Sequence, residues 1–493
     1  MPLPDQPLVV ATASVYLLVV VAIGFWATKR TRGPKDFFIA GQRIGLFVTG
    51  IATMSAAFSG FVFLGGPGLT YRLGIASLWI VLPVGLTSGL LCWVLAPRLR
   101  LLAEIREVYT LPDAIACRFG SRWAAGLAAL AVAFGCAAYL AVQLLALAVL
   151  LQSIFGLSGL APAMALGLSV LLAYSVLGGM VAGVYTDLFQ GGLMLVAAVA
   201  VFVRALRVTG GWQGLTGSIA ESTEFGPAFL EPLGTVPVFA AFGFFFVFGV
   251  GVLGQPQMLH KFYMLDDPRK LKWMPLVLGG SQAVCLLVWV GIGLAVPALV
   301  AQGRLEALAQ PDDAAPAFLI GHTPELLAGL VLAAVMAAIM SSADSFVNIG
   351  SAALVRDLPR ALGRPVRREL GWGRGAVVLI ALAACAVALG YGDLIALLGT
   401  LAFGTFGAAL APALAVGLNW SRVTSAAATA SIATGLLGTL LLETLAKPLL
   451  PPGVLPPAVA LAASFTVLFL VTWCSPRPGS AKIPPAVRAV MEL

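Results

Sequence analysis

Charged residues are scarce in this chain, and that scarcity excludes an ordinary soluble protein. Only 10% of the 493 residues are Asp, Glu, Lys or Arg, whereas a soluble domain carries roughly 25%. The mean hydropathy is +1.00, and 60% of the residues are hydrophobic. Most of the chain must therefore lie in lipid, and we expect an all-α polytopic membrane protein.

Histidine and paired cysteines are also scarce, which argues against a catalytic metal centre or a disulfide framework. The chain has two histidines, His260 and His322, and none of its six cysteines forms a C-x-x-C pair. A membrane enzyme would need paired acid–base or metal-binding groups near one face, and the apolar segments hold few ionisable residues. A channel is disfavoured as well, because no filter motif repeats along the chain.

Apolar segments long enough to cross a bilayer recur along the chain, and we count thirteen of them. Their limits are 8–27, 43–72, 74–96, 123–151, 161–179, 184–206, 237–260, 273–300, 325–354, 375–392, 394–417, 422–442 and 455–474. Most of the 29 basic residues, Lys261 among them, fall in alternate loops between these segments. Because cytoplasmic loops carry the excess of Lys and Arg, we expect the N-terminus outside and the C-terminus in the cytoplasm. The same distribution accounts for the net charge of +8 without a nucleic-acid partner.

Two of these segments are interrupted by glycine and proline. The second contains Ser59-Gly60 and then Gly65-Gly66-Pro67-Gly68, and the seventh contains Gly254-Gln255-Pro256. Such residues weaken a helix and free backbone groups, which survive in a membrane only where protein or a watery cavity satisfies them. Because the two interruptions lie five segments apart, they indicate two inverted repeats of five helices, each opening with a broken helix. Ordinary packing or kink positions remain the alternative.

The ninth segment carries the run Met340-Ser341-Ser342-Ala343-Asp344-Ser345, which places hydroxyls and a carboxylate at membrane depth. An ionisable side chain there usually marks a pathway or an ion site. Oxygen ligands with little net charge suit a hard monovalent cation that sheds water. The run therefore indicates transport.

Five short motifs give the chain a resemblance to the sodium/solute symporter family, and most of all to its sodium/proline symporters. They are Ser59-Gly60-Phe61 through Gly68, Gly178-Gly179 through Gln190, Gly254-Gln255-Pro256 through Phe262, Met340-Ser341-Ser342, and Phe406-Gly407-Ala408-Ala409 with Pro412. The resemblance implies a LeuT-like core of two inverted five-helix repeats with broken first helices. It also implies uptake of a small solute driven by inward sodium flow, with Na⁺ as the coupling ion.

The resemblance also implies a set of sodium ligands. They are the carbonyls of Ser55, Phe58 and Ala338 and the hydroxyls of Ser341 and Ser342. Ala338 and Ser341 are three residues apart, so they share a helix face. The alternative for the two serines is a bond back to a carbonyl of their own helix.

A second sodium site, or a sodium release path, is a further implication of the family. Asp187 would form it with Ser341, Asp344 and Ser345, of which the last three share a helix face. Asp187 is equally suited to cap a helix N-terminus. Sodium/proline symporters carry Asp two residues before the Ser-Gly pair where this chain has Ala57, and that change leaves proton coupling open.

Aromatic and amide side chains near the interruptions are candidates for a solute pocket. They are Phe61, Tyr139, Gln143, Phe248 and Gln255. The resemblance places the three aromatic residues at substrate positions, with Phe61 and Phe248 where the sodium/proline group has Trp. Packing, or an interhelical hydrogen bond for Gln143, is the alternative. Freed N–H groups at half-helix ends favour an anionic group, so we expect a small amino acid, proline-like, or a carboxylate.

We divide the chain into six parts on this basis. They are an extra helix and loop (1–42), the first repeat (43–210), an extracellular loop (211–236), the second repeat (237–420), two further helices (421–474) and a cytoplasmic tail (475–493). The expected protein is a multi-pass symporter of the cytoplasmic membrane with the lipid bilayer, a solute and sodium as partners. A membrane sensor that works with a separate signalling partner is the alternative, and the solute, the stoichiometry and the oligomeric state stay open.

Overall fold

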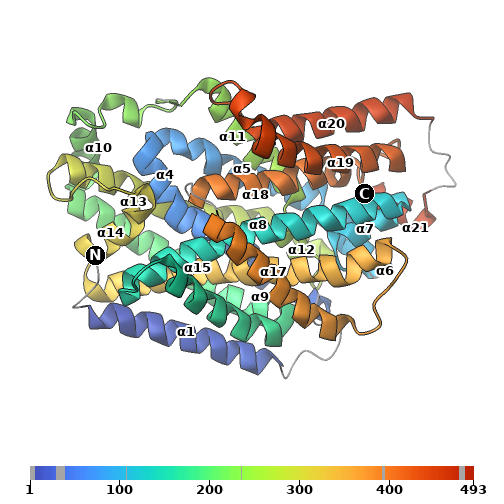
Figure 1. The fold of residues 1–493 in the computed structure, drawn as a ribbon, viewed down its shortest axis with the longest axis horizontal. Coiled ribbons are helices and arrows are strands. Elements are labelled where there is room, and N and C mark those ends of the chain that lie inside the picture. The colour runs from blue at the N-terminus through green and yellow to red at the C-terminus, as the bar shows by residue number, and fades with distance from the viewer. Residues whose placement is uncertain are drawn as a thin grey trace.

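The computed structural model describes residues 6–28, 39–106, 108–234, 236–390, 395–476 and 483–492. Within these ranges the fold is helical, apart from an isolated bridge between Ile44 and Leu265. Most of the long helices run along the longest axis of the molecule (Figure 1). We name its two ends after α10 and α6, which lie at opposite ends of that axis.

The α-helices follow one another along the chain with short 3₁₀ and π turns between them. The first half holds α1 (Pro7–Thr28), α3 (Leu46–Ala57), α4 (Gly66–Leu73), α5 (Leu78–Val94), α6 (Ala96–Arg106), α7 (Leu111–Phe119), α8 (Arg122–Phe155), α9 (Leu160–Thr209) and α10 (Gly211–Glu221). The second half holds α11 (Val238–Gly251), α12 (Pro256–Phe262), α13 (Met274–Ala301), α14 (Ala314–His322), α15 (Glu325–Ala352), α16 (Leu358–Ala361), α17 (Glu369–Gly390), α18 (Ile395–Ala411), α19 (Ser425–Leu441), α20 (Pro456–Cys474) and α21 (Pro485–Met491).

Local sequence signals set where several of these helices begin and end. Ser121 caps α8 by accepting the Ala124 N–H at 3.2 Å, and Gly156 closes that helix in the left-handed conformation, with φ 62°. Thr110 caps α7 in the same way. Hydroxyl N-caps and left-handed glycine ends satisfy backbone groups that the helix itself leaves free.

Ten helices or helix runs in the described ranges are long and apolar enough to cross a membrane. Each of the thirteen predicted segments overlaps a helix in the described ranges, which leave out residues 391–394, and three of them, near α1, α3 and the start of α9, fall on shorter apolar stretches. The protein is therefore a multi-pass membrane protein. The count of thirteen crossings and the inverted repeat stay predictions.

Helix α9 joins two predicted segments, 161–179 and 184–206, in one helical element. Ser175 donates to Asp344 Oδ1 at 2.7 Å, while a Cβ added at Gly183 would lie 2.7 Å from Asp344 Oδ2. In a straight helix residues eight apart are about 12 Å apart along the axis. The helix therefore bends around Asp344 where the sequence predicted a separate loop.

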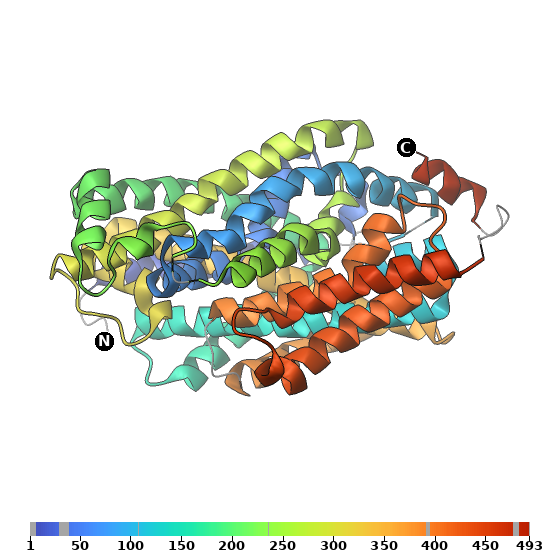
Figure 2. The ribbon, with the colours of Figure 1, turned by 90° about the horizontal axis from the view of Figure 1, so that it is seen from above.

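The core lies between helices that are far apart in the sequence. Helices α8, α15 and α18 are the most enclosed of the candidate spans. Helix α1 packs on α9 and α15, whereas α19 and α20 pack together on the opposite side of the bundle (Figures 1 and 2). The predicted ion and solute residues lie in the enclosed centre.

Candidate functional site

The first predicted interruption is a true break in the helix. Helix α3 ends at Ala57, and Phe58 takes an extended conformation with φ −97° and ψ 96°. The chain then enters a π-helical turn over Phe61–Gly65, whose start is tied to the Ser59 carbonyl by Val62 at 2.9 Å and Phe63 at 3.1 Å. Backbone groups around Phe58 thus leave the regular helical pattern deep inside the protein.

The glycine-rich run after this break is helical, which corrects the sequence-based expectation. Gly65 ends the π-helical turn, and Gly66, Pro67 and Gly68 open α4. Proline in the first turn of a helix costs little, because its missing N–H would have no partner there. Gly66 is needed for packing, since a Cβ there would lie 2.3 Å from the Trp289 ring.

Ser341 and Ser342 of α15 lie against the first break. Ser342 Oγ donates to the Ala56 carbonyl at 3.1 Å, and Ser55 Oγ donates to Ser341 Oγ at 3.0 Å. Both bonds run between α15 and α3, so the alternative in which these serines bond only to their own helix is wrong. The stretch of α15 that carries Ala338 also runs close to the break, because a Cβ at Gly60 would lie 2.9 Å from Ile339 Cγ1.

Asp187 of α9 joins the same group of residues. Its Oδ1 accepts a hydrogen bond from Ser341 Oγ, and its Oδ2 lies 2.6 Å from Lys261 Nζ of α12. Asp187 is inside α9, whose N-cap is Gly159, so the helix-capping alternative is wrong. Helices α3, α9, α12 and α15 therefore meet through one chain of buried polar contacts.

Asp344, three residues beyond Ser341, has different partners. Its Oδ1 accepts from Ser175 Oγ at 2.7 Å and from Asn348 Nδ2 at 3.1 Å. Among the described residues no hydrogen bond joins Asp344 or Ser345 to Asp187. The structure thus brings Asp187 and Ser341 of the predicted second site together but leaves the Asp344 carboxylate in a neighbouring group.

The second predicted interruption is also a break, at Gln255. Helix α11 gives way to a 3₁₀ turn over Val252–Gly254, and Gln255 is extended with φ −77° and ψ 108° before α12 begins at Pro256. The Gln255 amide donates to the carbonyls of Phe403 at 2.9 Å and Gly251 at 3.2 Å. Its amide nitrogen thus anchors the break to α18 in this structure.

The predicted solute residues separate into two groups of rings. Phe61 stacks on Phe248 with 5.5 Å between centroids, and Phe248 meets Phe403 at 4.6 Å. Tyr139 instead stacks on Phe346 at 4.4 Å. The first group packs between the first break, α11 and α18, whereas Tyr139 packs between α8 and α15.

Gln143 of α8 contacts the backbone just after the first break. Its Oε1 accepts the Gly60 N–H at 3.1 Å, so α8 holds the backbone just after the first break. Its Nε2 is buried and has no hydrogen-bond partner among the described residues. A buried donor without a partner is costly, and it is suited to an acceptor that arrives with a ligand.

Four residues at this centre were not predicted as site residues. They are Lys261, Ser175, Trp289 and Phe403. The charge pattern placed Lys261 in a cytoplasmic loop, but its side chain is 1% exposed and ion-paired. The signal that could have found it is its position only five residues after Pro256, one residue beyond the predicted segment that holds the break.

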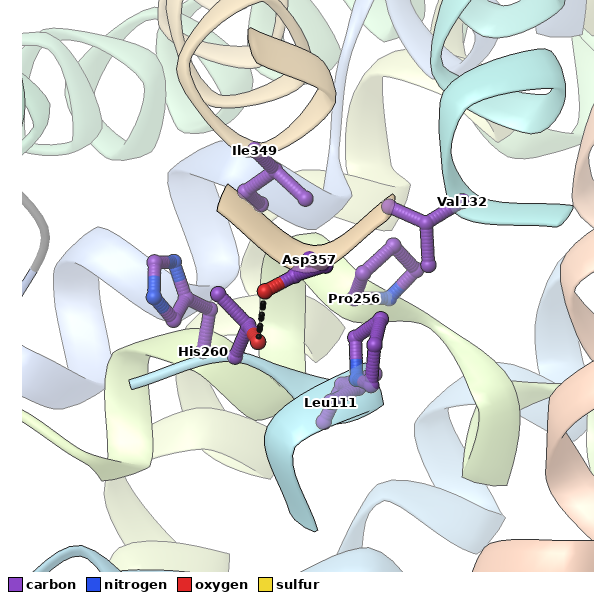
Figure 3. Close-up of a pocket in the computed structure, with 8 residues that line it drawn as sticks. Leu111, Val132, Pro256, His260, Ile349 and Asp357 are labelled. Atoms are coloured by element: carbon purple, nitrogen blue, oxygen red, sulfur yellow. Dashed lines mark hydrogen bonds between the residues drawn. The ribbon is translucent and has the colours of Figure 1, made fainter. Parts of the chain in front are cut away.

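The α6 end of the centre is closed by a second polar group. Thr110 Oγ1 donates to Asp357 Oδ1 at 2.9 Å, and the ring nitrogen Nε2 of His260 lies 2.7 Å from the Tyr109 carbonyl. Thr110, His260 and Asp357 line a cavity of about 10 Å³ between α7, α8, α12 and α15 (Figure 3), which is about the room that one water molecule needs. Arg356 holds the same region by bonding to Asp113 at 3.1 Å.

Two broken helices that meet at buried hydroxyls, carboxylates and an unpartnered amide, inside a multi-pass bundle, define a membrane transporter rather than an enzyme. The chain belongs to the sodium:solute symporter family, whose model matches residues 37–435. Members of this family couple solute transport to sodium, so sodium is the coupling ion of the class.

Curated relatives and solved structures agree with this assignment. The chain is 30% identical to a sodium/proline symporter of Escherichia coli over 441 residues, covering 85% of this chain and 84% of the relative. It is also 30% identical to a sodium/proline symporter of Haemophilus influenzae, with 85% of each chain covered.

The fold is similar to two solved transporters. One is a Na⁺-coupled sialic acid symporter in a substrate-bound outward-open state, with TM-score 0.78, 17% identity, and 95% of this chain and 98% of that chain covered. The other is a nucleobase-cation-symport-1 family transporter in a closed conformation, with TM-score 0.56, 13% identity, and 94% and 99% covered. At these identities the likeness shows the fold alone, which is LeuT-like.

Proposed function

We propose that the protein carries a small organic solute, an amino acid of the proline type or a carboxylate, into the cell together with sodium. The observation that carries this proposal is the meeting of the first break with the Ser341 and Ser342 hydroxyls. An unwound backbone and two hydroxyls supply the neutral oxygens that a monovalent cation needs. The curated relatives that are sodium/proline symporters support the choice of ion and the class of solute.

The cation site would comprise the carbonyls of Ser55, Phe58 and Ala338 with the two serine hydroxyls. Ser55 and Ser341 already share a hydrogen bond, and Ser342 holds the carbonyl of Ala56. An arriving ion would take these oxygens from their present partners, which a short rotation of each hydroxyl permits. Helices α3 and α15 would then be held together by the ion.

The solute would lie between the broken helices, against the Phe61 and Phe248 rings. Gln143 Nε2, which is buried and has no partner among the described residues, offers a hydrogen-bond donor to the solute. These features favour a compact solute with an apolar body and one carboxylate. A sugar would need more polar side chains in this wall than the centre provides.

Transport would follow from linkage between the two ligands. Sodium binding between α3 and α15 would favour the state in which the solute pocket is formed, and solute binding would permit closure and opening on the other side. We also infer that the protein lies in the cytoplasmic membrane with its N-terminus outside, as the basic loops indicate.

The test is uptake by purified protein in liposomes, with a panel of labelled solutes that includes proline, other amino acids and monocarboxylates. An inward sodium gradient should drive accumulation of at least one of these solutes, and potassium in place of sodium should abolish it. Uptake driven by a proton gradient without sodium would support the proton-coupled alternative. That alternative stays open because this chain has Ala57 where sodium/proline symporters carry Asp. Solute binding without accumulation would support the sensor alternative.

A further inference from the structure

The Lys261–Asp187 pair is a buried charge pair at the centre of the transporter. Lys261 Nζ lies 2.6 Å from Asp187 Oδ2, and each side chain is 1% exposed. Charges at membrane depth are costly unless they are paired, and such pairs usually belong to the working parts of a protein. Lys261 lies in α12, directly after the second break, so this pair links a broken helix to α9.

The lysine ammonium takes the place that a cation would need at Asp187. Oδ2 of Asp187 contacts the ammonium, and Oδ1 already accepts from Ser341 Oγ. Asp344 is occupied by Ser175 and Asn348. A sodium ion could bind Asp187 as a second site only after the ammonium had left.

The balance of charge at the centre agrees with this arrangement. Asp187 and Asp344 each carry a negative charge when ionised, Lys261 carries a positive one, and Asp344 is close enough to interact electrostatically with both. Two carboxylates and one ammonium leave a single negative charge. One monovalent cation neutralises it, and two would leave the buried centre positive, which is unfavourable in a low-dielectric interior.

We propose that Lys261 is a built-in cation which fills the second sodium site at Asp187, so that one sodium ion accompanies each solute. This inference rests on the proposed function and adds the stoichiometry and the residue that sets it. The ammonium replaces an ion that would otherwise have to be bound and released in every cycle.

The experiment counts sodium ions on purified protein and needs no solute. Binding of radioactive sodium and sodium-dependent thermal stability are measured in detergent, with choline as the replacement cation. The wild type should bind one sodium per chain with a Hill coefficient of about 1, and K261Q, which frees Asp187, should bind a second ion with a coefficient rising toward about 2.

Three matched variants separate the charge from the fold. K261R keeps a cation beside Asp187 and should bind one sodium, as the wild type does. The double variant K261Q/D187N removes both charges and should also return to one. D187N alone leaves the ammonium without this partner and should bind sodium more weakly than the double variant, because the cluster is then neutral without sodium and becomes positive when the ion binds.

The results overturn the inference in either of two ways. Two sodium ions on the wild type would show that Lys261 does not fill a site, and one ion on folded K261Q would show that the pair is only structural. If K261Q does not yield folded protein, the count on the wild type decides by itself. A wild type that binds no sodium at all would contradict the proposed function, which the liposome uptake assay tests separately.

Discussion

At the scale of single residues, the centre is held together by hydrogen bonds between polar groups of different helices. Ser342 bonds to the Ala56 carbonyl across the first break, and Ser341 lies between Ser55 and Asp187. Inside the membrane no water is available to the backbone groups at the break, and these hydrogen bonds take its place. The same oxygens are therefore both the support of the break and the proposed ligands of the ion.

Replacing either serine by alanine should weaken sodium binding. Ser341→Ala and Ser342→Ala each remove one oxygen that we assign to the ion, and a bond to a charged group is worth about 1.5–3 kcal/mol. The sodium concentration for half-maximal uptake should rise about 10-fold or more in each variant. Ser351→Ala is the matched control, since Ser351 is buried in the same helix but bonds to the Asn348 carbonyl. Wild-type sodium dependence in both variants would contradict the ligand assignment.

Replacing Gln143 should affect the solute more than the ion. Its Nε2 has no partner in the described part of the chain, while its Oε1 holds the Gly60 N–H. Gln143→Glu keeps an acceptor for Gly60 but removes the donor, and we expect the KM for solute to rise about 10-fold with little change in sodium dependence. Uptake kinetics at saturating sodium measure this. If Gln143→Glu kept the wild-type KM and Gln143→Leu lost transport, the role of Gln143 would be to hold the break.

The sequence predicted which residues gather at the centre better than it predicted their partners. Ser341, Ser342 and Gln143 stood out as polar groups in apolar segments, and the family resemblance added Asp187 and the ligand roles. Their partners come from segments far away in the chain: Gly60 donates to Gln143, and Ser175 donates to Asp344. Lys261 was assigned to a loop because a charge count cannot tell a solvated lysine from one paired at depth.

At the scale of helices, the two breaks were predictable and their neighbours were not. Ser59-Gly60 and Gly254-Gln255-Pro256 indicated breaks, and the structure has them at Phe58 and Gln255. The Gly65–Gly68 run gave the same signal but is helical, because proline there occupies a first turn. The bend of α9 beside Asp344 had no charge or proline to mark it.

Close contact between α11 and α18 depends on glycine at both helices. A Cβ at Gly407 would lie 2.7 Å from Gly251 Cα, and backbone cannot move aside as a side chain can. Gly407→Ala should cost about 1–3 kcal/mol through overpacking and lower the apparent melting temperature in detergent by several degrees. Gly280→Ala in α13, where a Cβ meets nothing within 4 Å, should leave it unchanged. Equal melting temperatures for both variants would show that the helices separate without cost.

At the scale of the whole molecule, different kinds of contact hold the two ends of the bundle together. The α6 end is held by charged groups, with Arg356 on Asp113 at 3.1 Å and Arg360 on Glu369 at 2.9 Å. At the α10 end, contacts such as Gln302 to the Thr209 carbonyl at 3.1 Å join side chains to backbone. In the transport cycle that we propose, each end opens in turn, so these contacts would be broken and remade. The number of membrane crossings and the orientation of the protein in the membrane do not follow from the helices themselves. Both depend on the surrounding lipid and on how charge is distributed among the loops.

Thr110 is the residue through which closure of the α6 end can be tested. It caps α7 by accepting the Asp113 N–H at 3.1 Å and donates to the buried Asp357 at 2.9 Å (Figure 3). Thr110→Val removes both bonds and leaves the Asp357 carboxylate without this donor, whereas Thr110→Ser keeps them. Loss of a cap and of a bond to the buried Asp357 carboxyl group is worth about 2 kcal/mol, so hydrogen exchange of α7 amides should quicken about 10-fold in the valine variant alone. Equal exchange in the two variants would mean that other contacts, such as Arg356 on Asp113, close this end without help from Thr110.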